Sequence, residues 1–85
     1  MAFKRSNRFM TERRRLGRNV RLLRTKRAWT LEHAAERMQL DLKHLQKVEA
    51  GLLNVTLVTL VRIADGLDVE VCALFARAAR QPRTR

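Results

Sequence analysis

The sequence predicts a small all-α domain of five helices, and three observations support this fold class. A chain of 85 residues is long enough for one domain but not for a barrel or a doubly wound sheet. It contains only three Gly and one Pro, so little interrupts a helix. Its β-branched residues are scattered and do not alternate with polar ones, so no strand pattern is present.

The charge balance predicts a polyanionic partner. Nineteen Lys and Arg against eight Asp and Glu give a formal net charge of +11. The excess lies in residues 1–47, with fourteen basic and four acidic side chains, whereas residues 48–85 hold five and four. Apolar residues make up 46% of the chain, so the charge decorates a folded domain and not a disordered segment.

Composition also excludes several classes of protein. The lone Cys72 rules out an intramolecular disulfide and a Cys-based zinc site, so we expect a reducing compartment and no metal. There is no run of eighteen apolar residues and no secretory signal, so we expect no membrane partner. His33 and His44 lack further zinc ligands at a suitable spacing, and no phosphate-binding glycine loop is present. We therefore expect a cytoplasmic, nucleoid-associated protein that is not an enzyme and uses no cofactor.

The first predicted helix covers residues 12–27, after a basic, loosely held arm at residues 1–10, and Thr11 is its candidate N-cap. Its apolar stripe consists of Leu16, Val20 and Leu23. The opposite face carries Arg14, Arg18 and Arg21. Eight basic side chains face only one acid, Glu12, so they repel one another unless an external anion is present. This face therefore contacts phosphate or is simply solvated.

Two short helices follow, separated by a tight turn. Thr30 caps the second helix, residues 31–38, and Asp41 caps the third, residues 42–50, which Gly51 ends in the left-handed conformation. Their inward residues are Ala34, Ala35, Met38, Leu45 and Val48. A short helix, a tight turn and a second short helix are typical of a helix-turn-helix motif.

Two further helices complete the predicted domain, which spans residues 11–80. Thr56 caps the fourth, residues 57–65, and Gly66 ends it. Asp68 caps the fifth, residues 69–80, and residues 81–85 form a tail. Nine of the twelve residues of the fifth helix are apolar, so this helix either enters the core deeply or contacts a second copy of the chain. Cys72 is expected to be a small core residue.

At this point the chain resembles the XRE family of Cro and phage-repressor-type helix-turn-helix regulators. The resemblance lies in LGRNVRLLR at residues 16–24, in Ala35, Glu49 and Gly51 around the two short helices, and in NVTLVTLVRIADGLDV at residues 54–69. It implies a five-helix, lambda-repressor-like DNA-binding domain. It also implies a structural ion pair between Arg24 and Glu49, whose loss would cost on the order of 3 kcal/mol.

The resemblance further implies how the domain meets double-stranded DNA, with the third helix in the major groove. Base contacts fall to Leu42, Lys43, His44, Gln46 and Lys47. Phosphate contacts fall to Arg14, Arg18, Arg21, Arg27 and Thr30, the last at the amino terminus of the second helix. The alternative interpretation of the polar residues is a solvated face.

Several residues depart from the family pattern. Leu31 replaces a frequent phosphate-binding Gln, Leu42 opens the third helix where a polar residue is usual, and Gln39 stands where Gly usually supplies a positive φ. Leu52 and Leu53 stand in the following loop, which is often basic in relatives. Together with Leu42 they predict an apolar patch for a protein partner.

We therefore predict a sequence-specific transcriptional regulator, most simply a repressor, that binds a near-palindromic operator as a homodimer. The predicted dimer interface consists of Val71, Leu74, Phe75 and Ala78. Two alternatives stay open: a protein-interaction module, such as an antitoxin or a partner of another transcription factor, and nonspecific coating of nucleic acid. The operator, the regulated genes and any inducer do not follow from the sequence.

Overall fold

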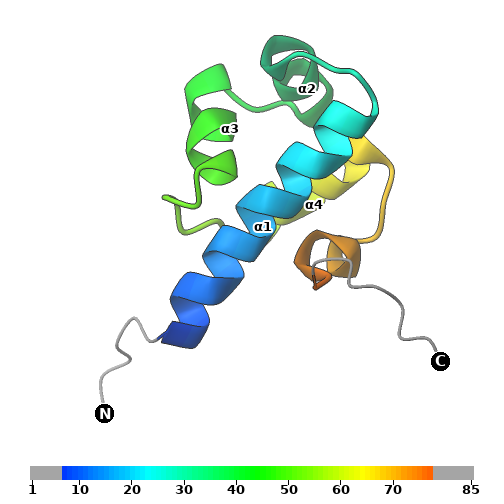
Figure 1. Ribbon diagram of the computed structural model, residues 1–85. Coiled ribbons are helices and arrows are strands. Elements are labelled where there is room, and N and C mark those ends of the chain that lie inside the picture. The colour runs from blue at the N-terminus through cyan, green and yellow to red at the C-terminus, as the bar shows by residue number, and fades with distance from the viewer. Residues whose placement is uncertain (1–6, 78–85) are drawn as a thin grey trace, which may run out of the picture.

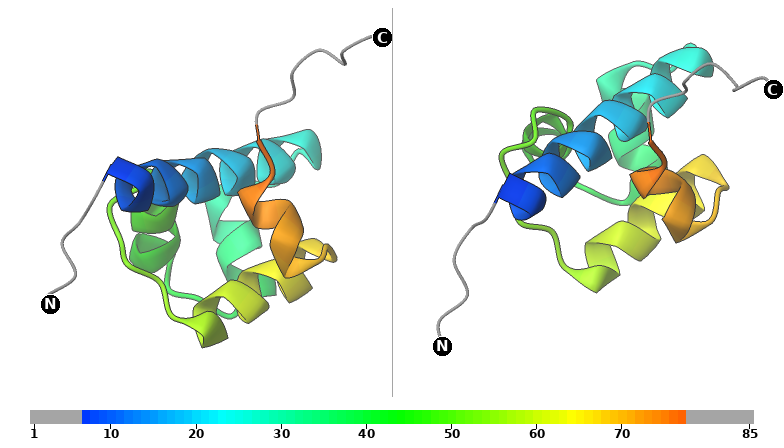
Figure 2. Two further views of the ribbon diagram at one scale, coloured as in Figure 1. Left: turned by 90° about the horizontal axis from the view of Figure 1, so that it is seen from below. Right: turned by 60° about the horizontal axis from the view of Figure 1, so that its bottom comes forward.

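The computed structural model describes residues 7–77, and within them the fold is entirely helical, as predicted. In chain order the elements are α1 (Asn7–Lys26), α2 (Leu31–Met38), α3 (Leu42–Glu49), α4 (Leu57–Leu67) and the short 3-10 helix η1 (Val71–Phe75). Figure 1 shows α1 crossing the molecule with α3 on one side and η1 on the other. Seen from below, α1 forms a layer above α2, α3 and α4 (Figure 2).

The first helix begins at Asn7, five residues before the predicted start. Thr11 therefore lies inside the helix and is not its N-cap, and residues 7–10 are not part of a loose arm. The first turns hold contacts of their own, because the Arg13 guanidinium lies 5.2 Å from the Phe9 ring centre and donates to the Asn54 side chain. Residues 1–6 of the predicted arm lie outside the described residues.

The helix-turn-helix motif has the predicted boundaries, except that α3 ends at Glu49, one residue before the predicted end, and it has most of the predicted capping. The Thr30 hydroxyl accepts a hydrogen bond of 3.0 Å from the His33 amide at the start of α2. Gln39 ends α2 with φ 59° and ψ 45°, the left-handed conformation that usually falls to Gly. Asp41 occupies the N-cap position of α3 with extended backbone, although its carboxylate makes no capping bond. Gly51, with φ 72°, follows α3 as predicted.

The core draws on every element. Its fully buried members are Leu16, Val20, Ala34, Ala35, Met38, Leu45, Val48, Ile63, Ala64, Leu67 and Leu74. Two glycines allow the closest helix contacts. A Cβ at Gly17 would lie 2.5 Å from the Val48 carbonyl oxygen, and one at Gly66 would lie 2.7 Å from Met38 Cγ. Gly17 thus brings α1 against the end of α3 and fixes the position of α3.

The carboxyl-terminal part of the domain differs from the prediction. Helix α4 continues to Leu67, so Gly66 does not end it, and Asp68 ends α4 with φ 59° and does not start a fifth α-helix. Instead of a helix over residues 69–80, five residues form η1, and Ala76 is extended with ψ 145°. Because η1 is a single short turn, Cys72 is exposed and is not a core residue, contrary to expectation.

A buried amide explains the short η1. The Asn19 side chain, 8% exposed, donates hydrogen bonds of 3.0 Å to the Leu74 carbonyl and 2.8 Å to the Ala76 carbonyl. In a continuing α-helix these carbonyls would accept from the backbone amides four residues later. Asn19 occupies them instead, and satisfying this buried amide ends the helical turn. Part of the apolar surface expected on the fifth helix is buried in the monomer, because Leu74 lies in the core.

Candidate nucleic-acid interface

The outer face of α3 presents three long polar side chains together. Lys43, Gln46 and Lys47 are exposed, while Leu45 and Val48 are fully buried on the opposite face. With Ala50 and Leu52, the three polar residues line one surface groove. This side of α3 therefore combines two ammonium groups with an amide that both donates and accepts, a chemistry that suits the edges of base pairs.

Two other predicted base-contact residues lie apart from this groove. Leu42 and His44 are half-buried and flank the exposed face of α3. Spacing explains the separation, since a helix turns about 100° per residue and positions 43, 46, 47 and 50 share its outermost side. Base contacts by Leu42 and His44 stay predictions.

The predicted ion pair is present and holds α3 against α1. Arg24 Nε donates to Glu49 Oε2 at 2.7 Å and Nη2 donates to Oε1 at 3.1 Å, which is a two-bond contact. The two side chains are 12% and 9% exposed. The hydrogen bond that Arg24 donates to Glu49 raises the pKa of Arg24, against an opposing effect of burial. Arg24 also donates to the Trp29 carbonyl at 2.9 Å, so it joins the start of the motif to its end.

Predicted phosphate-binding residues lie beside α3. Arg21 lines a groove with Leu31, Gln46 and Ala50, next to the ion pair. Arg14 lies at the α3–α4 loop, since its Cα is 3.3 Å from the position of a Cβ on Gly51. Arg18 is exposed on α1 between them in sequence. Thr30 is exposed at the amino terminus of α2. Arg14 and Arg21 thus place cations beside α3, and the phosphate contacts of all four residues stay predictions.

Arg27 does not fit its predicted role as a phosphate contact. Its guanidinium donates to the Leu23 carbonyl at 3.0 Å and to the Leu67 carbonyl at 2.8 Å. It also lies 5.7 Å from the centre of the Trp29 ring. Two of its donor nitrogens thus tie the end of α1 to the end of α4, and Arg27 is a structural residue. No pattern in the sequence predicts this bond, because Leu67 lies 40 residues away.

The predicted three-leucine patch is not continuous. Leu52 is 65% exposed, but Leu53 packs against the core and Leu42 is half-buried. A loop of extended residues between α3 and α4 explains the difference, since alternate side chains along it point in opposite directions. Leu52 alone therefore offers an exposed apolar surface beside the polar face of α3.

The predicted dimer interface is also wrong in its central residue. Leu74 is fully buried in the monomer, and Val71 and Phe75 pack partly against the core. Ala78 lies outside the described residues. Three of the five large exposed apolar side chains of residues 7–77 lie instead on α4, where Leu57, Val58 and Val61 are 70%, 61% and 42% exposed. The sequence carried a signal for this surface, because LVTLV places apolar residues on more than one side of α4.

Residues 7–77 contain neither a cluster of metal ligands nor a helix that could span a membrane. No group of three or more His, Cys, Asp or Glu side chains is arranged to hold a metal ion in this part of the chain. Likewise, none of the helices there is both long and apolar enough to cross a membrane.

Comparison with known proteins agrees with the geometry of the motif. A family model described as a helix-turn-helix domain matches residues 15–80. The chain belongs to the helix-turn-helix domain family. A search of the curated proteins gave no significant match.

Solved structures place this helix-turn-helix domain among regulators of the XRE type. The restriction-modification controller protein C.AhdI from Aeromonas hydrophila has 34% identity and a TM-score of 0.73 over 76% of this chain and 98% of that one. The hypothetical transcription factor NHTF from Neisseria has 28% identity and a TM-score of 0.75, with 79% and 77% covered. An HTH_3 family transcriptional regulator from Vibrio cholerae has 26% identity and a TM-score of 0.74, over 78% of this chain but 37% of that longer one. In fold and family, the domain is that of a DNA-binding transcriptional regulator.

Proposed function

We propose that this helix-turn-helix protein is a sequence-specific repressor that binds a near-palindromic operator as a homodimer. The observation that carries the proposal is the shared outer face of Lys43, Gln46 and Lys47 on α3, flanked by Arg14 and Arg21. Among residues 7–77 these cations have no carboxylate partner, because the ion pairs there join Arg15 to Glu12 and Arg24 to Glu49. Their charge is available to an external polyanion.

Each side chain then has a defined task on the duplex. With α3 in the major groove, Gln46 forms a two-bond contact with adenine, and Lys43 and Lys47 donate to guanine acceptors or to phosphate. Arg14 and Arg21 bind phosphates on either side of the groove and fix the register of α3. Repression follows from occupancy of a promoter that overlaps the operator. The similarity to a restriction-modification controller protein supports a role in control of expression.

The exposed apolar side of α4 supports the dimer. Leu57, Val58 and Val61 form an isologous contact in this proposal, replacing the buried Leu74 as its centre. A dimer places two α3 helices on half-sites about 34 Å apart, one turn of the duplex. Two short recognition helices then share the task of selecting one operator.

Gel shifts with genomic fragments, titrated with salt, test the proposal. Retention of a few fragments above competitor DNA supports an operator, and uniform retention supports nonspecific coating. Neutralising about six phosphates should weaken binding roughly a thousandfold between 50 and 200 mM salt. Absence of any retention at about 50 mM salt contradicts DNA binding altogether.

Removing the two lysines of α3 should abolish selectivity without loss of stability. In the double variant Lys43→Ala with Lys47→Ala, specific and competitor fragments should bind equally, while the melting temperature stays unchanged because both side chains are exposed. The matched control Arg62→Ala with Arg77→Ala removes the same charge from exposed positions on α4 and after η1. Full operator preference in the lysine variant, measured by competition gel shift, would show that α3 is not the reading element.

One observation favours a second candidate function, a protein-interaction module. Leu52, 65% exposed, lines the same groove as Lys43, Gln46 and Lys47, so a partner protein that covers α3 would also contact this leucine. The variant Leu52→Ser separates the two functions. Lost partner binding with intact DNA binding favours the interaction module, whereas unchanged partner binding excludes Leu52 from it.

A further inference from the structure

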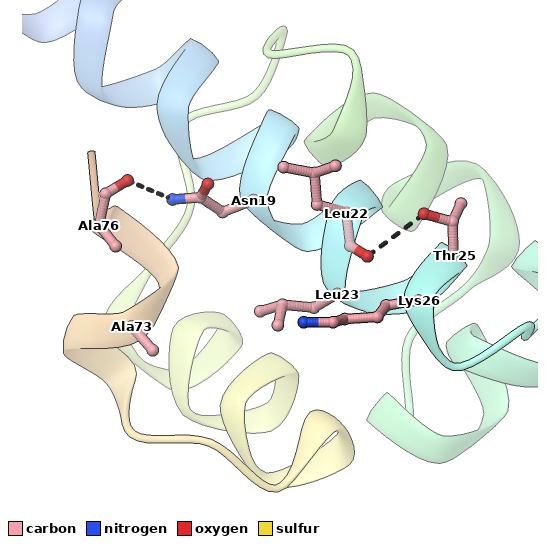
Figure 3. A pocket seen from close by; sticks show the side chains of 7 residues that line it. All are labelled: Asn19, Leu22, Leu23, Thr25, Lys26, Ala73 and Ala76. Carbon is pink, nitrogen blue, oxygen red and sulfur yellow. Dashed lines mark hydrogen bonds between the residues drawn. The ribbon is translucent and has the colours of Figure 1, made fainter. Parts of the chain in front are cut away.

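An apolar groove lies between α1 and η1, on the side of α1 away from α3 (Figures 1 and 3). We call it the α1–η1 groove. Its lining consists of Asn19, Leu22, Leu23, Thr25, Lys26, Ala73 and Ala76. Leu22 is 55% exposed in its wall, although a leucine gains from burial at such a place. The surface is therefore an apolar recess that residues 7–77 leave uncovered.

Two polar side chains of the groove already donate hydrogen bonds within the chain. Asn19 donates to the carbonyls of Leu74 and Ala76, and the Thr25 hydroxyl donates to the Leu22 carbonyl at 3.2 Å. Figure 3 shows the Asn19–Ala76 and Thr25–Leu22 bonds at the edges of the recess, with the leucine side chains between them. What remains open to a ligand is mainly carbon, and the buried Asn19 holds η1 at a fixed position relative to α1. The recess is thus preformed.

Charge selects the kind of occupant. Lys26 is the one charged residue in the lining, and the lining contains no carboxylate. Arg18, one turn before Leu22, and Arg77, next to Ala76, are exposed cations close to it in the chain. An occupant with carboxylates around an apolar centre complements this surface.

The chain itself supplies no such occupant. Residues 1–6 and 78–85 contain Lys4, Arg5, Arg80, Arg83 and Arg85 and no acid, so both terminal segments carry positive charge. A second copy that docked through the same surface would bring another Lys26 and no carboxylate from its lining. Electrostatic repulsion thus disfavours both the termini and a second copy at this surface, and an acidic segment of a different protein is the complementary choice.

We propose that the α1–η1 groove binds a short, acidic, amphipathic helix of a partner protein. Residues 19–26 span about 10 Å of α1, which matches two turns of a helix. Two or three apolar side chains at i, i+3 and i+4 lie over Leu22, Leu23 and Ala73, and carboxylates beside them face Lys26. Because α3 and η1 lie on opposite sides of α1, the partner helix leaves the face of α3 free (Figure 1).

Binding of a designed peptide tests this site directly. The probe is a fluorescein-labelled amphipathic peptide with leucine at i, i+3, i+4 and i+7. All of its charged residues are glutamate. Two control peptides carry lysine for each glutamate, or glutamine for each leucine. The full-length ¹⁵N-labelled protein is titrated with each, and anisotropy gives the dissociation constant. We expect the glutamate peptide to shift the amides of Leu22, Lys26 and Ala73, and both control peptides to bind at least about tenfold more weakly.

Protein variants complete the test. Leu22→Ser and Lys26→Glu should each raise the dissociation constant of the glutamate peptide by about tenfold. The melting temperatures of both variants should stay unchanged, because both side chains are exposed. Leu52→Ser is the matched control, an equally exposed leucine on the other side of the molecule, and should bind as the wild type does. Amide shifts confined to Lys43, Gln46 and Lys47, loss of binding in Leu52→Ser, equal binding of the lysine peptide, or no binding of the glutamate peptide would each overturn the proposal.

Discussion

At the scale of single residues, the Arg24–Glu49 ion pair holds α3 against α1. Arg24→Met leaves the Glu49 carboxylate buried and unpaired, and should cost about 3 kcal/mol of unfolding free energy. The double variant Arg24→Met with Glu49→Leu removes both charges and should recover much of that loss. Urea denaturation of the variants measures the difference. A double variant less stable than Arg24→Met would contradict the assignment of the loss to an unpaired charge.

The pH dependence of the same variant follows from the sign of the pKa shift. Because the pKa of Arg24 is raised in the folded protein, its stabilising effect is complete below the ordinary guanidinium value and is lost only at more alkaline pH. The stability difference between wild type and Arg24→Met should therefore not change through titration of Arg24 between about pH 6 and 9.

Backbone strain gives a second prediction at this scale. Ala28 has φ 59°, in the left-handed region that costs an L-residue roughly 1 kcal/mol. Ala28→Gly should therefore stabilise the protein by about 0.5 to 1 kcal/mol in urea denaturation. Ala50→Gly is the matched control, since Ala50 has φ −80° and the same change there should destabilise. Destabilisation by Ala28→Gly would show that this strain is absent in solution.

Single residues were predictable where chemistry and pattern coincided. Arg24 stands beside the apolar stripe of α1, and the family resemblance supplies Glu49 as its partner, so the pair was identified from sequence. Arg27 looked like any other exposed cation. Its partner is the backbone carbonyl of Leu67, which every residue type offers equally, so no pattern in the sequence marks that bond.

At the scale of elements, the contact of α1 with α3 depends on the missing side chain of Gly17. Gly17→Ala raises helix propensity by about 1 kcal/mol, but its Cβ would clash with the carbonyl oxygens of Val48 and Glu49 at 2.5 and 2.6 Å. Overpacking should prevail and destabilise the protein by about 1 to 3 kcal/mol in thermal unfolding. DNA affinity should fall too, because α3 must move. A melting temperature at or above that of the wild type would contradict the close contact.

The elements themselves were predicted well where local signals decide them. Thr30, Asp41 and Thr56 mark the starts of α2, α3 and α4 by capping preference, and the structure confirms each start. The prediction of a fifth helix over residues 69–80 was wrong, because the length of this helix depends on Asn19 of α1. The Asn19 side chain donates hydrogen bonds to the carbonyls of Leu74 and Ala76. A side chain 55 residues away in sequence lies beyond the reach of local periodicity.

At the scale of the whole molecule, α1 separates two surfaces of different character. On one side, α3 presents Lys43, Gln46 and Lys47 with Arg14 and Arg21 close by. On the other side lies the α1–η1 groove, with an apolar wall and Lys26. Net charge and motif predicted the first surface from sequence. The second depends on where the extended residues after η1 lie against α1, which requires the tertiary structure.

In the proposed complex, α3 contacts the base edges and the cations of α1 contact the phosphates. Selection of bound fragments from random double-stranded DNA, performed with wild type, Gln46→Ala and Arg14→Ala, tests it most directly. The wild type should enrich a motif with twofold symmetry. Gln46→Ala should lose the preference at one base pair in each half-site, worth about 1 to 3 kcal/mol, and Arg14→Ala should weaken binding without changing the motif. An identical motif for wild type and Gln46→Ala would contradict base reading by this face of α3.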